Sequence, residues 1–339
     1  MRAFVTGGTG LLGRPLVETL QEDGWEVTVL TRDPVRAKDL EARGVQIVEG
    51  DVTRPRFNAS LARADVVFHV AGLYEVGLRE FRRMIDVNVT GTANVLAAAR
   101  RENVGRVVFT STAGVFAPTP RDRPVTESAP VQTALPDPYV TSKVQAHQLA
   151  VAEMHAGLPL TIVLPAAVFG PGDTGQLGRT LALLARGRLP RLPRGFGVNT
   201  WTHAADIARG HVLAATRGKP GELYILGDRV LPVVEFYRKA ADAAGVKSPN
   251  PSVPLGLARL AARFSEAKAW LAGRTPVLSR AALDFARVDI VVDASKARRD
   301  LEWTPAPLED RIRETMAWYV DTYRIRRAPL PVKPNTASG

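Results

Sequence analysis

The chain has 339 residues, of which 45% are hydrophobic and 23% charged, so it can bury a sizeable core and has the composition of an ordinary globular protein. It contains no cysteine, which excludes disulfides, thiolate metal sites and cysteine nucleophiles. The net charge is +11, but the arginines are scattered and no basic tract carries interleaved aromatic residues, so we expect no nucleic-acid partner.

Short apolar runs alternate with helical segments through the first half of the chain. The runs predicted as strands cover residues 2–6, 26–31, 45–49, 66–70, 106–110 and 160–164. The segments predicted as helices cover residues 11–23, 34–43, a short stretch near Leu61, 87–102 and 138–156. This alternation predicts an α/β fold, a Rossmann-type doubly wound parallel sheet with helices on both faces.

The alternation loosens beyond residue 165. Helices are predicted at residues 177–186, 206–216, 232–244, 256–272, 279–285 and 308–324, and a strand at 223–226. We expect residues 1–165 to form a dinucleotide-binding domain to which residues 200–227 return. Residues 166–199 and 228–327 then form a smaller, mostly helical C-terminal substrate lobe, and the proline-containing tail 328–339 is expected to be disordered.

Targeting and metal-binding signals are missing from the sequence. No stretch approaches the roughly 20 apolar residues of a membrane span, and the first residues resemble a strand rather than a signal peptide. The five histidines include no pair three or four residues apart, so we expect no metal site. We expect a cytoplasmic protein with no membrane span.

A glycine-rich turn joins the first predicted strand to the first helix. Gly7, Gly10 and Gly13 recur every third residue, and Gly8-x-Gly10-x-x-Gly13 overlaps them. Such glycines permit a tight turn, let the backbone approach a pyrophosphate and bring the helix close to the sheet. The helix N-terminus then offers N–H groups to the anion. We therefore expect a dinucleotide to contact Gly7, Thr9, Gly10, Leu11, Leu12 and Gly13.

The end of the second strand indicates which dinucleotide binds. NAD-binding proteins commonly place an acidic residue there, to accept hydrogen bonds from the ribose 2′-hydroxyl. Here Thr31 takes that place and Arg32 follows, with Arg36 nearby. A guanidinium pairs with a 2′-phosphate, which favours NADP(H) over NAD(H). NAD stays open, because Asp33 would take the acidic position if the strand ended two residues later.

Other residues follow the third and fourth strands at the same predicted edge. Asp51 and Val52 follow one strand, and Ala71 and Gly72 follow the other. Ligands of doubly wound sheets bind at the carboxyl ends of the strands, so we expect all four residues at the cofactor site. Asp51 can accept a hydrogen bond from the adenine amino group or cap the next turn, and both roles remain open.

Tyr139 and Lys143 are four residues apart near the start of a predicted helix, so they share one face about 6 Å apart. A free tyrosine ionises near pH 10, and a neighbouring ammonium lowers that pKa. Tyr139 can then donate a proton to a carbonyl group during reduction. Thr112 follows the fifth strand and is our candidate for orienting the substrate oxygen, with Ser111 as the alternative.

With these residues in place, the sequence from residue 1 to about 324 resembles an extended short-chain dehydrogenase/reductase. The resemblance rests on residues 6–13, Asp51, Asn88-Val-x-Gly-Thr92, Thr110-Ser-Thr112, Tyr139/Lys143, Pro165-x-x-x-x-Gly170-Pro171 and Asp206. It implies that Thr112, Tyr139 and Lys143 are catalytic and that Gly7, Gly10, Gly13 and Arg32 bind the cofactor. It also implies that Pro165 and following residues, including Val168, support the nicotinamide.

Departures from subfamily patterns narrow the activity. Ala113-Gly114 stand where related sugar-nucleotide dehydratases have Asp-Glu, and the Arg-Asp-Phe of the epimerases is missing at Asn199-Thr-Trp201. The sequence is closer to dihydroflavonol-4-reductase-like proteins. We expect an NADP(H)-dependent oxidoreductase that reversibly reduces a ketone or aldehyde. A sugar-nucleotide epimerase and a non-catalytic dinucleotide-binding regulator are the alternatives.

The substrate residues carry the weakest signals. Tyr74, Phe116 and Trp201 are candidates for lining the substrate site, but each is also explained by packing. The predicted helix near residues 257–271 either covers an apolar substrate or turns its apolar face to the core. The expected partner is a small carbonyl or alcohol substrate, and a homodimer is an open alternative for the assembly.

Overall fold

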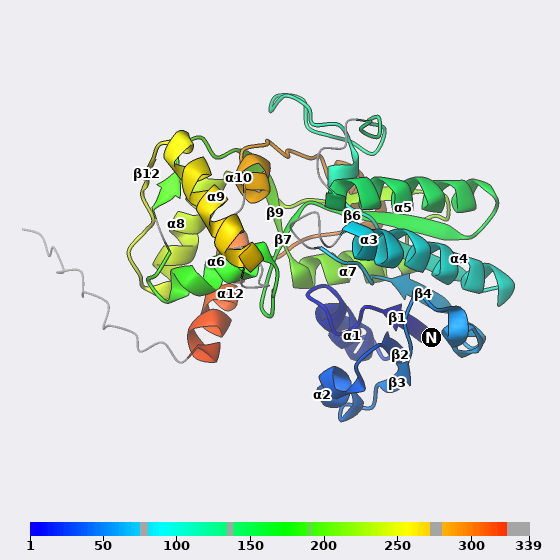
Figure 1. Cartoon of the computed structure of the whole chain (residues 1–339). Coiled ribbons are helices and arrows are strands. Elements are labelled where there is room, and N and C mark those ends of the chain that lie inside the picture. Colours follow the sequence, from blue (N-terminus) through cyan, green and yellow to red (C-terminus); the bar gives the residue numbers. More distant parts are fainter. Residues whose placement is uncertain (75–80, 134–137, 190, 272–279, 324–339) are drawn as a thin grey trace, which may run out of the picture.

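The computed structural model describes residues 1–74, 81–133, 138–189, 191–271 and 280–323. Its centre is a seven-stranded parallel sheet in the order β10-β6-β5-β4-β1-β2-β3 (Figure 1). The strands are β1 Arg2–Thr6, β2 Glu26–Thr31, β3 Gln46–Glu49, β4 Val66–His69, β5 Arg106–Thr110, β6 Leu160–Pro165 and β10 Leu223–Leu226. The predicted α/β fold and parallel sheet are confirmed.

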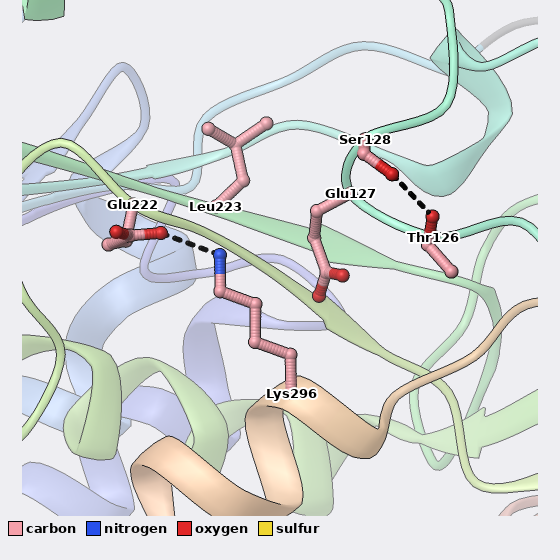
Figure 2. Close-up of a pocket in the computed structure, with 6 residues that line it drawn as sticks. All are labelled: Thr126, Glu127, Ser128, Glu222, Leu223 and Lys296. Atoms are coloured by element: carbon pink, nitrogen blue, oxygen red, sulfur yellow. Dashed lines mark hydrogen bonds and ion pairs between the residues drawn. The ribbon is translucent and has the colours of Figure 1, made fainter.

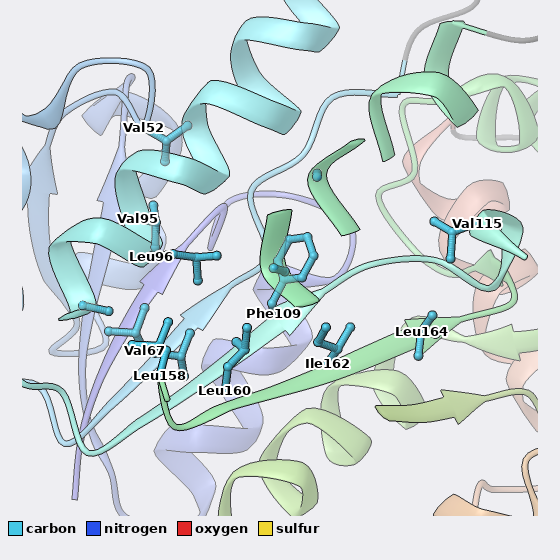
Figure 3. Close-up of a cluster of buried hydrophobic side chains, with 14 of the residues drawn as sticks. Val52, Val67, Val95, Leu96, Phe109, Val115, Leu158, Leu160, Ile162 and Leu164 are labelled. Carbon is cyan, nitrogen blue, oxygen red and sulfur yellow. The ribbon is translucent and has the colours of Figure 1, made fainter. Parts of the chain in front are cut away.

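Helices cover both faces of this sheet. One face packs against α1 Gly13–Glu22, α2 Lys38–Glu41, α7 Ala204–Thr216 and α11 Ser295–Leu301. The other packs against α4 Gly91–Arg101 and α5 Pro138–His155, and Figure 3 shows Val95 and Leu96 of α4 turned toward β-strand residues such as Val67 and Phe109. Because both faces are covered, strands such as β6 are buried along their whole length.

Several shorter elements connect these layers. They are the 3-10 helices Pro34–Ala37, Pro55–Leu61 and Ala113–Val115, α3 Phe81–Ile85 and the π-helical turn Asp86–Thr90. The single helix predicted over residues 87–102 is therefore a π-helical turn followed by α4, and the helix predicted over 34–43 divides into a 3-10 turn and α2. The π-helical turn carries Asn88, whose side chain has a specific role in the site.

The parallel register brings the strand ends to one edge. Thr6 at the end of β1 lies beside Leu30 of β2 and His69 of β4. On the other side of β4, His69 pairs with Phe109 of β5, which precedes Thr110. The loops that follow β1, β2, β4 and β5 therefore open at a common rim, where the sequence had placed its candidate site residues.

The C-terminal region packs a second core beside the sheet (Figure 1). A three-stranded sheet in the order β11-β9-β7 and a two-stranded sheet pairing β12 with β8 belong to it. Their bounds are β7 Ala167–Phe169, β8 Leu192–Pro193, β9 Val198–His203, β11 Arg229–Pro232 and β12 Pro251–Val253. The helices are α6 Gln176–Ala185, α8 Val233–Ala244, α9 Leu255–Leu271, α10 Arg280–Phe285 and α12 Leu308–Thr322.

The chain after β9 runs through α7 to β10, which pairs with β6 at the edge of the main sheet. A buried ion pair ties this returning segment to α12. Arg311 donates to both carboxylate oxygens of Asp206, at 2.6 and 3.0 Å, and the Nε1 of Trp303 donates to the Asp206 carbonyl oxygen at 2.8 Å. Among the described helices, none is long and apolar enough to cross a membrane. The tail predicted to be disordered lies outside the described residues.

Candidate functional site

The glycine-rich turn after β1 is packed so tightly that side chains would not fit. Gly7 adopts a φ of +75°, and a Cβ there would lie 2.6 Å from the backbone nitrogen of Ala71. A Cβ on Gly13 would overlap the Gly7 carbonyl oxygen, which accepts a hydrogen bond from the Gly10 N–H at 3.0 Å. The turn is therefore shaped by the absence of side chains at these positions.

The same turn leads into α1 without a capping side chain. Leu12 precedes the helix and makes no side-chain hydrogen bond to its first N–H groups, and the first turn holds no acidic residue. Thr9, Leu11 and Leu12 are half-buried and Gly10 is exposed. An uncapped helix N-terminus behind a side-chain-free turn fits the pyrophosphate of a dinucleotide.

Arg32 and Asp33 follow the end of β2, and the Asp33 carboxylate forms a local hydrogen bond. The strand ends at Thr31, as predicted. Arg32 is exposed, whereas the Asp33 carboxylate accepts the N–H of Val35 at 3.1 Å and caps the next 3-10 turn. The Asp33 side chain therefore has a local structural role, and Arg32 offers an exposed cationic group near the expected ribose position.

Asp51 and Val52 follow β3 at the same rim. The Asp51 carboxylate accepts hydrogen bonds from the N–H and hydroxyl of Thr53, at 2.9 and 3.0 Å, so the capping role is present. Val52 is buried, and its carbonyl oxygen accepts a hydrogen bond from Asn94 at 2.8 Å. Its side chain packs on the helix that begins at Gly91.

Lys143 is the buried cation of the site. Its side chain is 6% exposed, and its Nζ donates to the Thr110 carbonyl oxygen at 2.8 Å and lies 5.3 Å from the centre of the Phe109 ring. Burial lowers the pKa of Lys143 to about 8, because desolvation disfavours the charged ammonium. A Cβ on Gly72 would come within 4.0 Å of this Nζ, which places the loop after β4 directly against Lys143.

Tyr139 begins the same face of α5, one helical turn before Lys143. The Tyr139 side chain is half-buried. Its ring packs edge-to-face against the ring of Tyr74, with ring centres 4.7 Å apart and an interplanar angle of 85°. Tyr74 is 41% exposed. Tyr74 therefore borders the candidate proton donor, and its role at a substrate site stays a prediction.

Asn88 joins the loop after β4 to α5. Its Oδ1 accepts the Leu73 N–H at 2.7 Å, and its Nδ2 donates to the Leu73 carbonyl oxygen and to the Ser142 hydroxyl, both at 2.9 Å. Ser142 in turn donates to the Tyr139 carbonyl oxygen at 2.7 Å. The sequence marked Asn88 only through the family motif, since these partners are distant in the chain.

His69 extends this network toward the glycine-rich turn. Its Nδ1 lies 2.7 Å from the Thr6 hydroxyl, which accepts the Ala71 N–H, and its Nε2 lies 3.0 Å from the Thr92 hydroxyl. Thr92 donates to the Asn88 carbonyl oxygen, so His69 donates through Nε2 and accepts at Nδ1. Burial, with a smaller contribution from the Lys143 charge, lowers the pKa of His69 to about 3.

The loop after β5 carries the candidate hydroxyls. Thr112 is half-buried, and its side chain accepts the Gly114 N–H at 3.2 Å. Ser111 is buried and its hydroxyl lies 3.1 Å from Nδ1 of His147, whose pKa burial lowers to about 4. Thr112 is therefore the more accessible of the two, and Ser111 is engaged with α5. Phe116 is 4% exposed, and its ring packs on His147, so packing accounts for it.

Pro165 ends β6 and is buried, and Val168 is half-buried in β7 beside Thr202. Trp201 is 3% exposed, and its ring stacks on Phe236 with ring centres 3.8 Å apart. Trp201 also donates to the Leu231 carbonyl oxygen at 3.2 Å. Trp201 therefore lies in the core of the C-terminal region, and of its two predicted roles, packing accounts for these contacts.

A pocket of about 390 Å³ lies elsewhere, at the amino end of the edge strand β10 (Figure 2). Lys296 pairs with Glu222 across it at 2.6 Å, and the Glu127 carboxylate accepts the N–H of Ile225 at 2.9 Å. Because Tyr139, Lys143 and the glycine-rich turn gather at the carboxyl ends of the strands, this pocket is separate from them. Its side chains close the edge of the sheet.

Comparisons with known proteins agree with this geometry. The model of the NAD dependent epimerase/dehydratase family matches residues 3–227. A ketoreductase of Stigmatella aurantiaca, which acts on 4-hydroxy-2-methyl-3-oxo-4-farnesyl-3,4-dihydroquinoline-1-oxide, is 33% identical over 89% of this chain and 91% of its own. A Synechocystis sp. protein with a dihydroflavonol 4-reductase name is 28% identical over 93% of this chain and 94% of its own. The crystal structure of gox2253 superposes with a TM-score of 0.80 at 28% identity, covering 96% of this chain and 99% of that one.

Proposed function

The chain belongs to the NAD dependent epimerase/dehydratase family, and we propose that within it the chain is an NADP(H)-dependent oxidoreductase that reversibly reduces a ketone or aldehyde. The observation that carries this proposal is Lys143, a buried ammonium with a lowered pKa, one turn from Tyr139 and against the loop at Gly72. A buried ammonium beside a tyrosine stabilises the tyrosinate, which helps the tyrosine to transfer a proton.

The proposed chemistry follows from the residues around this ammonium. Tyr139 donates its phenolic proton to the carbonyl oxygen of the substrate and takes it back in the reverse reaction. Lys143 stabilises negative charge on the Tyr139 oxygen, and the Thr112 hydroxyl orients the carbonyl oxygen and stabilises charge that develops on it. A bound nicotinamide supplies or accepts the hydride. Asn88 fixes α5 against the loop at Leu73 and so holds Tyr139 in register.

Reduction is favoured over epimerisation by two observations. The relative at 33% identity is named a ketoreductase. The epimerase Arg-Asp-Phe is replaced by Asn199-Thr-Trp201, and in the structure Trp201 is a core residue. We also propose that residues 1–165 and 200–227 bind the cofactor and that residues 166–199 and 228–327 form the substrate lobe.

The preference for NADP(H) rests on Arg32. Its guanidinium is exposed at the end of β2, and the neighbouring Asp33 carboxylate is held by the Val35 N–H. We expect Arg32→Ser to raise the KM for NADPH by roughly tenfold or more, the worth of a charge-assisted hydrogen bond, while the KM for NADH changes little. Steady-state kinetics with each cofactor tests this, and equal effects on both would remove Arg32 from the 2′-phosphate site.

The central experiment measures NADPH absorbance while purified protein is mixed with a panel of ketones and aldehydes. We expect net NADPH consumption, which an epimerase would not produce. Tyr139→Phe should lower kcat by about 10²- to 10⁴-fold, the range for losing a general acid. Tyr323→Phe removes a hydroxyl on the distant end of the chain and serves as the matched control. A Tyr139→Phe variant that keeps full activity would overturn the proposal.

A further inference from the structure

Helix α9 buries three alanines and exposes four large apolar side chains among the residues whose side chains the structure describes. Its buried residues include Ala258, Ala262 and Ala269. By contrast, the large apolar side chains that it exposes include Leu257, Leu260, Phe264 and Leu271, at 60%, 49%, 69% and 78%. A helix that serves only the core shows the opposite arrangement, with its large apolar residues toward the protein.

These four large residues form one stripe. At about 100° per residue they fall within about 60° of arc on the helix surface, on the side opposite the three alanines. The inner face is satisfied by a small cluster in which Ala258 and Ala262 pack with Leu283 of α10 and Val253. The exposed fractions of the four stripe residues show that the stripe faces solvent, and α9 is labelled in the C-terminal region in Figure 1.

Positive charge flanks the stripe. Arg263 and Lys268 are exposed, and neither forms an ion pair with any residue that the structure describes. The acidic residues nearby are already engaged, because Glu266 binds the backbone and side chain of Arg280 and Asp284 pairs with Arg259. The exposed face of α9 therefore combines large apolar side chains with two cations that no described carboxylate pairs.

We propose that α9 docks on the surface of a bilayer that contains anionic phospholipids. The stripe residues enter the boundary between headgroups and acyl chains, and Arg263 and Lys268 contact lipid phosphates. The net charge of +11 favours an anionic surface. A second copy of this chain is a poorer occupant, since pairing two such faces brings like charges together. The helix lies on the membrane in this arrangement, with no segment crossing it.

Vesicle flotation with the full chain tests the stripe. We expect the protein to float with vesicles of phosphatidylglycerol and phosphatidylcholine at low salt. The double variant Leu260→Ser/Phe264→Ser should weaken this partition by at least about tenfold, because it removes two large apolar groups from the interface. Val35→Ser is the matched control, since Val35 is 68% exposed on another part of the molecule.

The charges are tested separately with Arg263→Gln and Lys268→Gln, each of which should weaken binding about fivefold on anionic vesicles. Equal binding to pure phosphatidylcholine, or stripe and control variants that bind alike, would overturn the proposal. Concentration-dependent dimerisation that the stripe variant abolishes, without vesicle binding, would assign the face to a second copy instead. NADPH-dependent activity on a water-soluble carbonyl and the circular dichroism spectrum verify folding, and the vesicle result stands whether or not the proposed reduction is correct.

Discussion

Lys143 illustrates how a single side chain acquires its chemistry from burial. Among the described residues, its ammonium donates to the Thr110 carbonyl oxygen and lies 5.3 Å from the centre of the Phe109 ring, and no carboxylate pairs with it. Desolvation is consequently the cause of its lowered pKa of about 8. The residue is charged at neutral pH and close to losing its proton just above it.

The pH profile should report this proton. We expect kcat/KM for carbonyl reduction to fall as the pH rises through about 8, where the Lys143 ammonium becomes neutral. Lys143→Arg keeps its charge over the whole range, because arginine is always protonated. The variant should be less active and should move this decline upward by more than about one pH unit. An inflection that stays at the wild-type pH would assign it to another group.

Among the elements, the junction of the glycine-rich turn and α1 leaves no room for a side chain at Gly13. Gly13→Ala places a methyl group on the Gly7 carbonyl oxygen and so forces α1 away from the turn. We expect the Kd for NADPH to rise at least about tenfold, since the phosphate must meet correctly placed N–H groups. Fluorescence titration measures the Kd. Gly105→Ala, where a Cβ meets only Asp65 at 3.5 Å, should leave it unchanged.

The pairing of α7 with α12 is a second element-level constraint. Asp206 is buried, with a side chain 7% exposed, and Arg311 binds it through two nitrogens. Asp206→Ala leaves this largely buried guanidinium with only the half-exposed Glu314 carboxylate, at 2.9 Å, as an ion-pair partner among the described residues, and we expect the free energy of unfolding to drop by about 3 kcal/mol. Urea denaturation provides the measurement.

A comparison with an exposed pair isolates the effect of burial. Lys239 and Glu309 form an ion pair at 3.1 Å whose carboxylate is 57% exposed, and Lys239→Met should change stability by less than about 1 kcal/mol. If Asp206→Ala were equally mild, the buried pair would contribute no more to stability than the exposed one.

At the scale of the whole molecule, buried histidines make the fold sensitive to acid. Burial is the main cause that lowers the pKa of His69 to about 3 and of His147, His203 and His211 to about 4. The unfolded chain binds protons on these residues near pH 6.5, before the folded protein does. The free energy of unfolding is therefore unaffected by these histidines above about pH 6.5, and it declines as the pH falls toward 4 because the unfolded chain takes up protons first.

We expect the free energy of unfolding, measured by urea denaturation, to drop between about pH 6.5 and pH 4, on the order of 1 kcal/mol per pH unit for each histidine that stays neutral in the folded protein. His211→Phe removes one of these groups, so the loss of stability with falling pH should become shallower. His155→Gln removes an exposed histidine and is the control. Parallel curves for wild type and His211→Phe would show that other groups govern acid unfolding.

Local patterns predicted much of this molecule. Apolar runs gave β1, β2, β5 and β10 with their exact bounds, and fixed spacings identified the glycine-rich turn and the Tyr139/Lys143 pair. Strands β7, β8, β11 and β12 were missed because each spans four residues or fewer, and the six-residue β9 was missed because it directly follows a proline-, arginine- and glycine-rich stretch. Trp201 was offered as a substrate contact or as packing, and its stacking on Phe236 is decided by long-range contacts that no local spacing encodes. The same holds for the partners of His69 and Asn88.

The order of strands has a consequence for synthesis. β6 is translated well before its outer neighbour β10, with β7, α6, β9 and α7 between them. While the ribosome adds those segments, the nascent sheet ends in an uncovered strand that can join foreign chains. Glu127 is already made by then, yet the Ile225 amide that it will cap does not exist. The emerging chain is therefore most dependent on chaperone protection until Leu226 has left the ribosome.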